Sequence, residues 1–136
     1  MKKLTAASAL LLLLLSLALS PPAAGQARGG WLRGVWEGRG FQIDTDSAEP
    51  WAMRLTARGG RYSVEYPSLD CGGRWRLVSL ARRRAVFEET ITRGAERCAP
   101  RGRFVVERLS ARQFGFWYSH AGSSDYVASG ILNRRP

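Results

Sequence analysis

The sequence predicts an all-β fold, a small antiparallel up-and-down barrel of about eight strands closed by one disulfide, following a cleaved signal peptide. Three observations lead to this prediction. After residue 27, no stretch repeats its apolar residues with the period of a helix. Eight short runs instead alternate apolar with polar residues, or are rich in β-branched and aromatic side chains. Their short links, rich in Gly, Pro, Ser and Asp, favour antiparallel pairing of consecutive strands.

The N-terminus has the three parts of a secretory signal peptide over residues 1–27. Lys2 and Lys3 supply the positive charge, and an apolar run follows from Ala6 to Leu19. This run is short for a membrane-spanning helix, which needs roughly 20 apolar residues, so a membrane anchor is the weaker alternative. Gly25-Gln26-Ala27 offers the small residues that signal peptidase requires. We therefore expect cleavage after Ala27, a single domain over residues 28–136 and a periplasmic or secreted location.

Cleavage leaves 109 residues that hold 19 arginines, no lysine and 11 acids, which is a net charge of +8. That length suits one domain with one core, and we expect a monomer. The positive charge predicts attraction to anionic surfaces. Outside the cytoplasm these are lipopolysaccharide, cell-wall polymers or acidic proteins, and nucleic acid is not an expected partner.

Two cysteines remain in the exported part, Cys71 and Cys98. A pair of cysteines in an exported chain predicts a disulfide. A metal site is the alternative, but His120 is the only histidine and neither cysteine has a neighbour at ligand spacing. We expect no metal and no cofactor.

The predicted strands are, in order, Gly34–Ile43, Trp51–Arg58, Arg61–Tyr66, Arg74–Ala81, Ala85–Ile91, Arg103–Leu109, Gln113–Ser119 and Tyr126–Leu132. Gly59-Gly60, between the second and third, is a two-residue link typical of hairpins, and Arg82–Arg84 forms another tight turn. Eight strands joined in this way can close on themselves, which removes exposed edges. A two-sheet sandwich is the alternative.

Alternation within the strands assigns side chains to the interior. In order along the chain, the sets sharing an apolar face are Trp36 with Gly38, Gly40 and Gln42; Trp51, Met53, Leu55 and Ala57; Tyr62, Val64 and Tyr66; Trp75, Leu77 and Ser79; Phe104 and Val106; and Phe114, Phe116 and Tyr118. The arginines fall on the opposite face of each strand. We therefore expect the basic charge to be spread over the outer wall and not gathered in one cleft.

Glu89 shares the face of Phe87 and Ile91. If that face points inward, the carboxyl group must be paired or hydrogen-bonded. One explanation is a structural Arg or Tyr partner. The other is that Glu89, with Gln42, orients a small ligand in an apolar cavity; its walls would be Tyr66, Trp75, Phe116 and Tyr118. The interior of an eight-stranded barrel is filled by side chains or holds one small ligand, and the many large aromatics favour a filled one.

No recognisable catalytic machinery is present, so we expect no enzymatic activity. The link that holds His120 lacks the strained turn that would present a nucleophilic serine. Asp44, Asp46 and Glu49 fall together in one link but lack the full pattern of a calcium loop. Trp117 stands opposite its aromatic neighbours, which indicates either sheet packing or an exposed contact surface.

Two parts of the sequence resemble known families. The run Gly34-Val35-Trp36 resembles the Gly-x-Trp start of lipocalin-type and avidin-type barrels, the calycin group, and implies that Trp36 plugs one end of the barrel. Nothing after Leu132 could form the C-terminal helix of lipocalins. The residues Tyr66-Pro67-Ser68-Leu69-Asp70-Cys71-Gly72-Gly73, then the run 87–94 and Cys98, are similar to a small extracytoplasmic bacterial domain with no established activity. This second resemblance implies a Cys71–Cys98 bridge.

Together these observations predict a non-enzymatic, secreted or periplasmic binding protein. This protein would bind either a small hydrophobic molecule or an anionic component of the cell envelope. The alternative is a periplasmic inhibitor or interaction module that acts on a protease or lysozyme-type enzyme. Such an inhibitor would insert a loop or a terminus into its target, for which Arg28–Arg33 is available.

Overall fold

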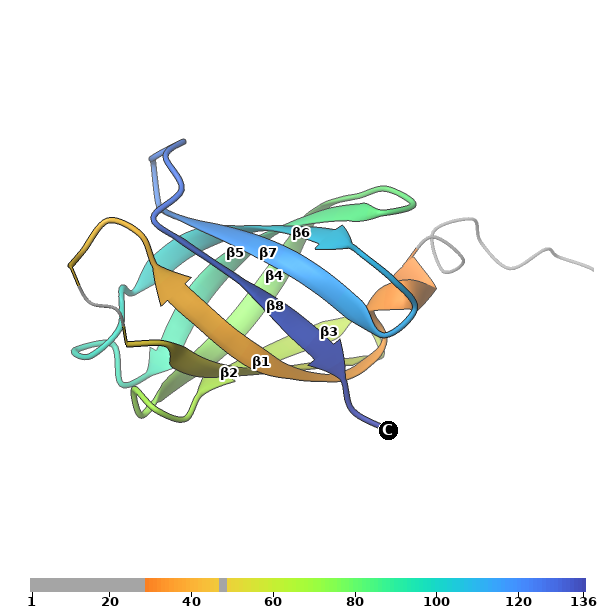
Figure 1. Ribbon diagram of the computed structural model, residues 1–136, viewed down its shortest axis with the longest axis horizontal. Coiled ribbons are helices and arrows are strands. Elements are labelled where there is room, and N and C mark those ends of the chain that lie inside the picture. The colour runs from red at the N-terminus through yellow and green to blue at the C-terminus, as the bar shows by residue number, and fades with distance from the viewer. Residues whose placement is uncertain (1–28, 47–48) are drawn as a thin grey trace, which may run out of the picture.

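The computed structural model describes residues 29–46 and 49–136, so the predicted signal peptide lies outside the described residues. Eight antiparallel strands form a closed barrel in sequence order, and β1 pairs with β8 to complete it (Figure 1). The strands are β1 (Gly34–Gln42), β2 (Trp51–Arg58), β3 (Arg61–Tyr66), β4 (Cys71–Leu80), β5 (Arg84–Arg93), β6 (Arg101–Arg108), β7 (Gln113–His120) and β8 (Ala128–Arg134). The predicted all-β, up-and-down barrel is confirmed, and the sandwich alternative is wrong.

The boundaries of β2 and β3 are as predicted, and those of the other six strands differ by one to three residues, most clearly in β4 and β8. β4 begins at Cys71, because Gly72 and Gly73 continue the pairing with β3 and also pair with β5, with a register shift between them. A Cβ on Gly73 would lie 2.1 Å from the carbonyl oxygen of Thr90, so glycine is what allows β4 and β5 to approach this closely. β8 begins at Ala128, later than expected, and continues to Arg134.

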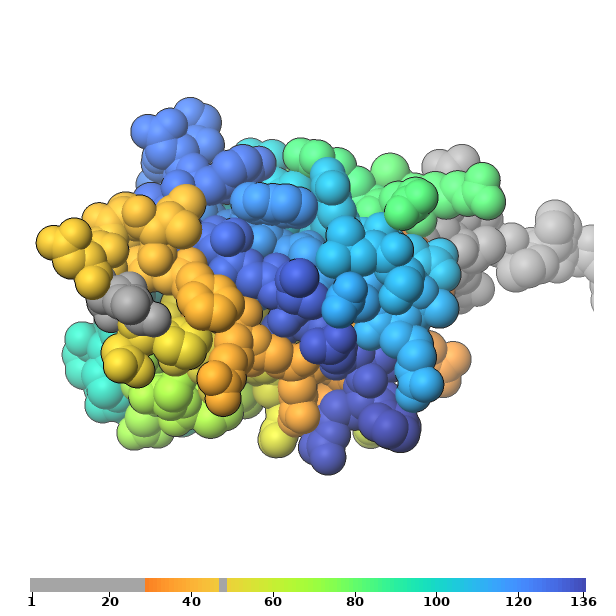
Figure 2. Space-filling view, viewed as in Figure 1, coloured from red at the N-terminus to blue at the C-terminus, as the bar shows by residue number. Residues whose placement is uncertain are grey.

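The barrel has two different ends, which we call the closed end and the open end. The closed end carries the links 59–60, 81–83 and 109–112, a 3₁₀ turn η1 (Gly30–Leu32) before β1, and the C-terminus. The open end carries the links 43–50, 67–70, 94–100 and 121–127, and it lies on the left in Figure 1. In Figure 2, residues of the first and last of these links project beyond the wall formed by β1, β7 and β8.

The interior of the closed half is filled by side chains. The inward faces are those that alternation predicted, except in β4, where a register shift after Leu77 leaves Ser79 exposed and packs Leu80 against the core. The largest inward side chains are less than 2% exposed: Trp36, Phe87, Phe104, Phe114 and Phe116. Their rings are in contact, with centroids 4.7 Å apart for Trp36 and Phe114 and 5.5 Å apart for Phe104 and Phe116. Burial of such rings is the main favourable contribution to the stability of this half.

The chain before β1 is held against the closed end. Trp31 and Leu32 are buried, and Trp36 donates its indole N–H to the carbonyl oxygen of Leu32 at 2.8 Å. The Arg134 guanidinium donates to the carbonyl oxygens of Trp31 and Arg33 and lies over the Trp36 ring, 4.4 Å from its centroid. The expectation that this segment is free to insert into a target is therefore wrong for residues 29–33, because packing and hydrogen bonds fix it.

Basic charge lies on the outer wall, as alternation predicts, but the links at the two ends of the barrel differ in charge. Arginines do lie on the outer face of the strands, but several are ion-paired there, such as Arg54 with Glu37 and Arg84 with Glu107. Six of the 11 acids fall in the four links of the open end: Asp44, Asp46, Glu49, Asp70, Glu96 and Asp125. The three links of the closed end hold no acid and carry Arg82, Arg83 and Arg112. The molecule is therefore polarised from end to end.

Within the described residues, no helix has the length and apolar character to cross a membrane.

Candidate ligand-binding cavity

A cavity of about 550 Å³ opens at the open end of the barrel. Its walls come from β1, β2, β3, β5, β6 and β7 and from the links 43–50, 67–70 and 94–100. The lining residues are Gln42, Thr45, Glu49, Pro50, Trp51, Tyr66, Ser68, Leu69, Glu89, Arg97, Cys98, Ala99, Phe104, Tyr118 and His120. This size and this combination of aromatic walls with a few polar groups are typical of small-molecule sites.

Glu89 is the buried acid of this cavity, with only 4% of its surface exposed. Its Oε2 accepts a hydrogen bond from the Tyr66 hydroxyl and another from the Trp75 indole N–H, the latter at 2.9 Å. Both hydrogen bonds end on the same oxygen, so Oε1 accepts no hydrogen bond from the described residues.

Burial controls the ionisation of this group. Burial raises the pKa of Glu89 to about 7, and the hydrogen bonds from Tyr66 and Trp75 oppose part of that rise. Burial, followed by the charge of Glu89, raises the pKa of Tyr118 to about 12. The same causes, together with its hydrogen bond to Glu89, raise the pKa of Tyr66 well above its ordinary value. Both phenols therefore stay protonated, and Glu89 alone among these three changes charge near neutral pH.

Two glycines make room for the aromatic walls. A Cβ on Gly40 of β1 would lie 2.3 Å from the Trp51 ring, and a Cβ on Gly102 of β6 would lie 2.1 Å from the Tyr118 ring. Both rings therefore lie flat against a neighbouring strand. Trp51 also contacts Tyr66, with ring centroids 5.4 Å apart, so these rings form a connected wall.

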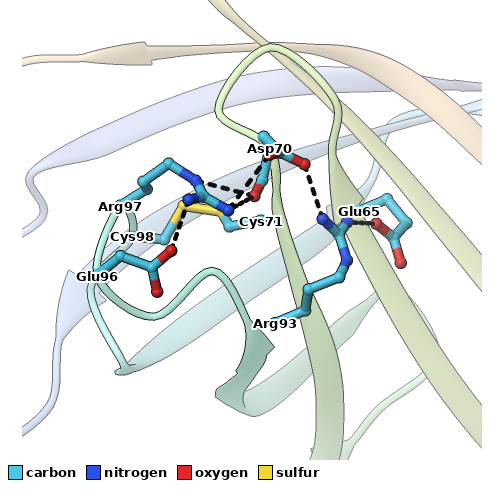
Figure 3. Close-up of polar contacts among 7 residues, drawn as sticks. All are labelled: Glu65, Asp70, Cys71, Arg93, Glu96, Arg97 and Cys98. Atoms are coloured by element: carbon cyan, nitrogen blue, oxygen red, sulfur yellow. Dashed lines mark hydrogen bonds and ion pairs between the residues drawn. A yellow bond between two sulfur atoms is a disulfide. The ribbon is translucent and has the colours of Figure 1, made fainter.

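One side of the cavity is fixed by a disulfide and a group of ion pairs (Figure 3). The Cys71–Cys98 bridge joins the start of β4 to the link 94–100, with the two Cα atoms 6.4 Å apart. Arg97 pairs with Glu96 and with Asp70, which lies in the link 67–70.

Arg93 of β5 pairs with the same Asp70 and with Glu65 of β3. Figure 3 shows Asp70 between the two guanidinium groups. The links 67–70 and 94–100 are thus tied together on one side of the mouth.

The structure brings together four of the six predicted ligand-contacting residues: Gln42, Tyr66, Glu89 and Tyr118. The other two do not line the cavity. Trp75 contacts Phe104, with ring centroids 4.3 Å apart, and acts on the cavity through its hydrogen bond to Glu89. Phe116 belongs to the packed core and is fully buried. Trp36, which the calycin resemblance placed as a plug, lies in the closed half.

Sequence reasoning missed several lining residues. Trp51 and Phe104 were assigned to inward faces, but alternation alone does not say how far along the barrel a side chain lies. Arg97 and His120 belong to the link 94–100 and to the end of β7, where the strand pattern gives no signal. The expectation of a filled interior is correct for the closed half and wrong for the open half.

The cavity does not present a recognisable catalytic arrangement among the described residues. The Ser123 hydroxyl accepts the backbone N–H of Asp125 at 3.0 Å and so serves the turn. The His120 ring packs edge-on against Tyr118, with centroids 5.6 Å apart. No three His, Cys, Asp or Glu side chains in the described part of the chain are grouped so that they could hold a metal ion.

The fold and the cavity define a class: a closed eight-stranded antiparallel barrel, filled at one end and hollow at the other. Comparison with protein-family models, with curated proteins and with solved structures gives no match in any of the three. The resemblances to calycins and to the bacterial domain therefore stay predictions.

Proposed function

We propose that this chain is a non-enzymatic, extracytoplasmic binding protein that holds a small, largely apolar molecule in its open end. The observation that carries the proposal is the cavity of about 550 Å³, which has aromatic walls and a buried carboxyl group. Apolar surface in a ligand would be removed from water by the rings, and the polar groups would fix its orientation. The disulfide supports a location outside the cytoplasm, because such bonds persist in oxidising compartments.

Binding of a neutral, environment-sensitive dye such as Nile red tests this proposal. We expect saturable fluorescence enhancement with the mature protein. Substitution Ala99→Trp places a large ring in the lining of the cavity and should weaken dye binding by roughly tenfold or more. Ala81→Trp, in the link 81–83 at the closed end, is the matched control and should bind like the unsubstituted protein. Equal dye affinity in all three proteins would show that the dye does not enter the cavity.

A second candidate is the interaction module acting on a protease or lysozyme-type enzyme. It is favoured by apolar side chains on the outer wall where β1 and β8 meet: Phe41 is 50% exposed and Ile131 is 47% exposed. Ile43 and Tyr126, beside the open end, are exposed as well. Exposed apolar groups that are close together often mark contact surfaces.

Enzyme assays separate this candidate from the first. An inhibitor should slow lysozyme or a serine protease in a dose-dependent way, and Phe41→Ser/Ile131→Ser should abolish the effect without changing Nile red binding. Activity that is unaffected by any concentration of the unsubstituted protein would remove this candidate.

A further inference from the structure

The charges around the cavity determine whether it favours an anionic, a neutral or a cationic ligand. Glu89 lines the cavity, its Oε1 accepts no hydrogen bond from a described residue, and Glu49 of the link 43–50 lines the cavity as well. Among the described lining residues, Arg97 carries the only permanent positive charge. That charge is already met by Glu96 and Asp70, and its guanidinium also donates to the Asp70 carbonyl oxygen at 2.8 Å. An anionic ligand would therefore find no uncompensated cation and would face a buried acid.

The aromatic walls favour a cation for a separate reason. Trp51, Tyr66, Phe104 and Tyr118 line the same cavity as Glu89. The face of an aromatic ring carries negative potential and attracts ammonium groups, more strongly where water is excluded. The acids in the links of the open end add a field of the same sign at the entrance.

A neutral ligand would leave the acid poorly compensated. It would cover Oε1 and remove water from a carboxyl group that already has 4% exposure, without supplying a countercharge. An ammonium group at Oε1 supplies both the countercharge and N–H donors.

We propose that the ligand of the open end carries a protonated amine on a hydrocarbon body, and that the ammonium group binds the Oε1 side of Glu89 between the rings of Trp51, Tyr66 and Tyr118. This inference rests on the proposed ligand-binding function and names its substrate class as alkylammonium or arylalkylammonium compounds. The hydrocarbon body packs along the remaining aromatic wall.

Competition with bound Nile red by three compounds of one carbon skeleton tests the inference: phenylbutylammonium, phenylbutanol and phenylbutyrate. At about pH 8 the amine is protonated and Glu89 is above its pKa of about 7. We expect the ammonium compound to bind roughly tenfold or more tightly than the alcohol, and the carboxylate most weakly. In Glu89→Gln the ratio of ammonium to alcohol affinity should fall severalfold, to the smaller preference that the aromatic rings support without the acid. Trp51→Leu, which keeps apolar area but removes a ring, should lower the same ratio if Glu89→Gln fails to fold.

Glu88→Gln is the matched control, since Glu88 lies on the outer face and pairs with Arg76. It should keep the full preference for the ammonium compound. Equal affinities of the ammonium compound and the alcohol, or a preference that is undiminished in Glu89→Gln, would overturn the amine inference while ligand binding stands. Dye binding that is insensitive to Ala99→Trp would overturn the proposed function as well, so the two failures are distinguishable.

Discussion

At the scale of single residues, Glu89 lines the candidate site and also affects the stability of the barrel. Its Oε2 is held by Tyr66 and Trp75, which fixes the position of the carboxyl group, and its burial disfavours the ionised form. A purely apolar side chain in its place would avoid that cost. It would also leave the Tyr66 hydroxyl and the Trp75 indole N–H without their acceptor. The hydrogen bonds therefore give Glu89 a structural role, and its role in ligand binding stays a prediction.

The first prediction concerns the pH dependence of stability. The pKa of Glu89 rises from 4.5 to about 7 on folding. Between these values the folded state keeps a proton that the unfolded state has lost, so this group lowers the free energy of unfolding as the pH rises, by up to about 3 kcal/mol. The loss is complete above about pH 7. The free energy of unfolding, measured by urea titration at about pH 5 and at about pH 8, should decrease more between these pH values in the unsubstituted protein than in Glu89→Gln.

Glu88→Gln should follow the unsubstituted protein in this comparison, because the Glu88 side chain is 45% exposed on the outer face. Parallel pH profiles of the unsubstituted protein and Glu89→Gln would mean that Glu89 ionises as it does in the unfolded chain.

The sequence predicted part of this site at residue level. Alternation placed Glu89 with Phe87 and Ile91, and the structure buries all three. The donors to Glu89 come from β3 and β4, and their identity depends on the register between strands, which alternation does not define. Arg134 was missed for a related reason: it acts on Trp31 and Trp36, which are about 100 residues away in sequence.

At the scale of elements, the link 94–100 is held in position by cross-links more than by packing. Cys98 is bonded to Cys71 at the start of β4, and Arg97 reaches the carbonyl oxygen of Asp70 in the link 67–70. The ion pairs of Arg97 are exposed, and exposed pairs contribute little to stability. The disulfide is therefore the main restraint on this side of the cavity.

The second prediction is that loss of the disulfide destabilises the whole barrel. The bridge closes a segment of 27 residues, and in the chain-entropy model such a bridge contributes roughly 3–4 kcal/mol. Cys71→Ser/Cys98→Ser should lower the free energy of unfolding by about that amount in urea titrations. Addition of a reductant should weaken the unsubstituted protein and leave the double variant unchanged. A loss below about 1 kcal/mol would show that β4 and the link 94–100 are held together by other contacts.

The elements themselves were largely predictable, because period-two alternation records which face of a strand is buried. Each of the eight strands was anticipated, and errors were confined to their ends. The start of β4 was missed because Gly72-Gly73 is typical of a turn, whereas here a side chain on Gly73 would meet the backbone of β5 and one on Gly72 would meet the Glu65 side chain of β3. A local pattern does not report that kind of tertiary requirement.

At the scale of the whole molecule, charge divides the barrel into an acidic open end and a basic closed end. Arg108 and Arg112 lie close enough to Arg134 to affect its ionisation. Partial burial, followed by these two positive charges, lowers the pKa of Arg134 below its ordinary value. Arg82 and Arg83 are exposed in the link 81–83 at the same end. A barrel that binds an anionic envelope component would therefore present its closed end to it and keep the cavity directed away from the surface.

The last prediction follows from this polarity. Each arginine near an anionic bilayer contributes about 1 kcal/mol at low ionic strength, so Arg82→Ser/Arg83→Ser should weaken binding to vesicles of anionic phospholipid by about 2 kcal/mol, roughly 30-fold. Arg39→Ser/Arg103→Ser removes the same charge from the outer wall of β1 and β6 and is the matched control. If net charge alone drives binding, both variants weaken it equally in vesicle sedimentation. If the closed end is the docking face, Arg82→Ser/Arg83→Ser loses far more vesicle binding than the control. Added salt then removes this difference between the variants, because it screens exposed charges beyond about 8 Å. Nile red binding should be the same in both variants, since neither pair lines the cavity.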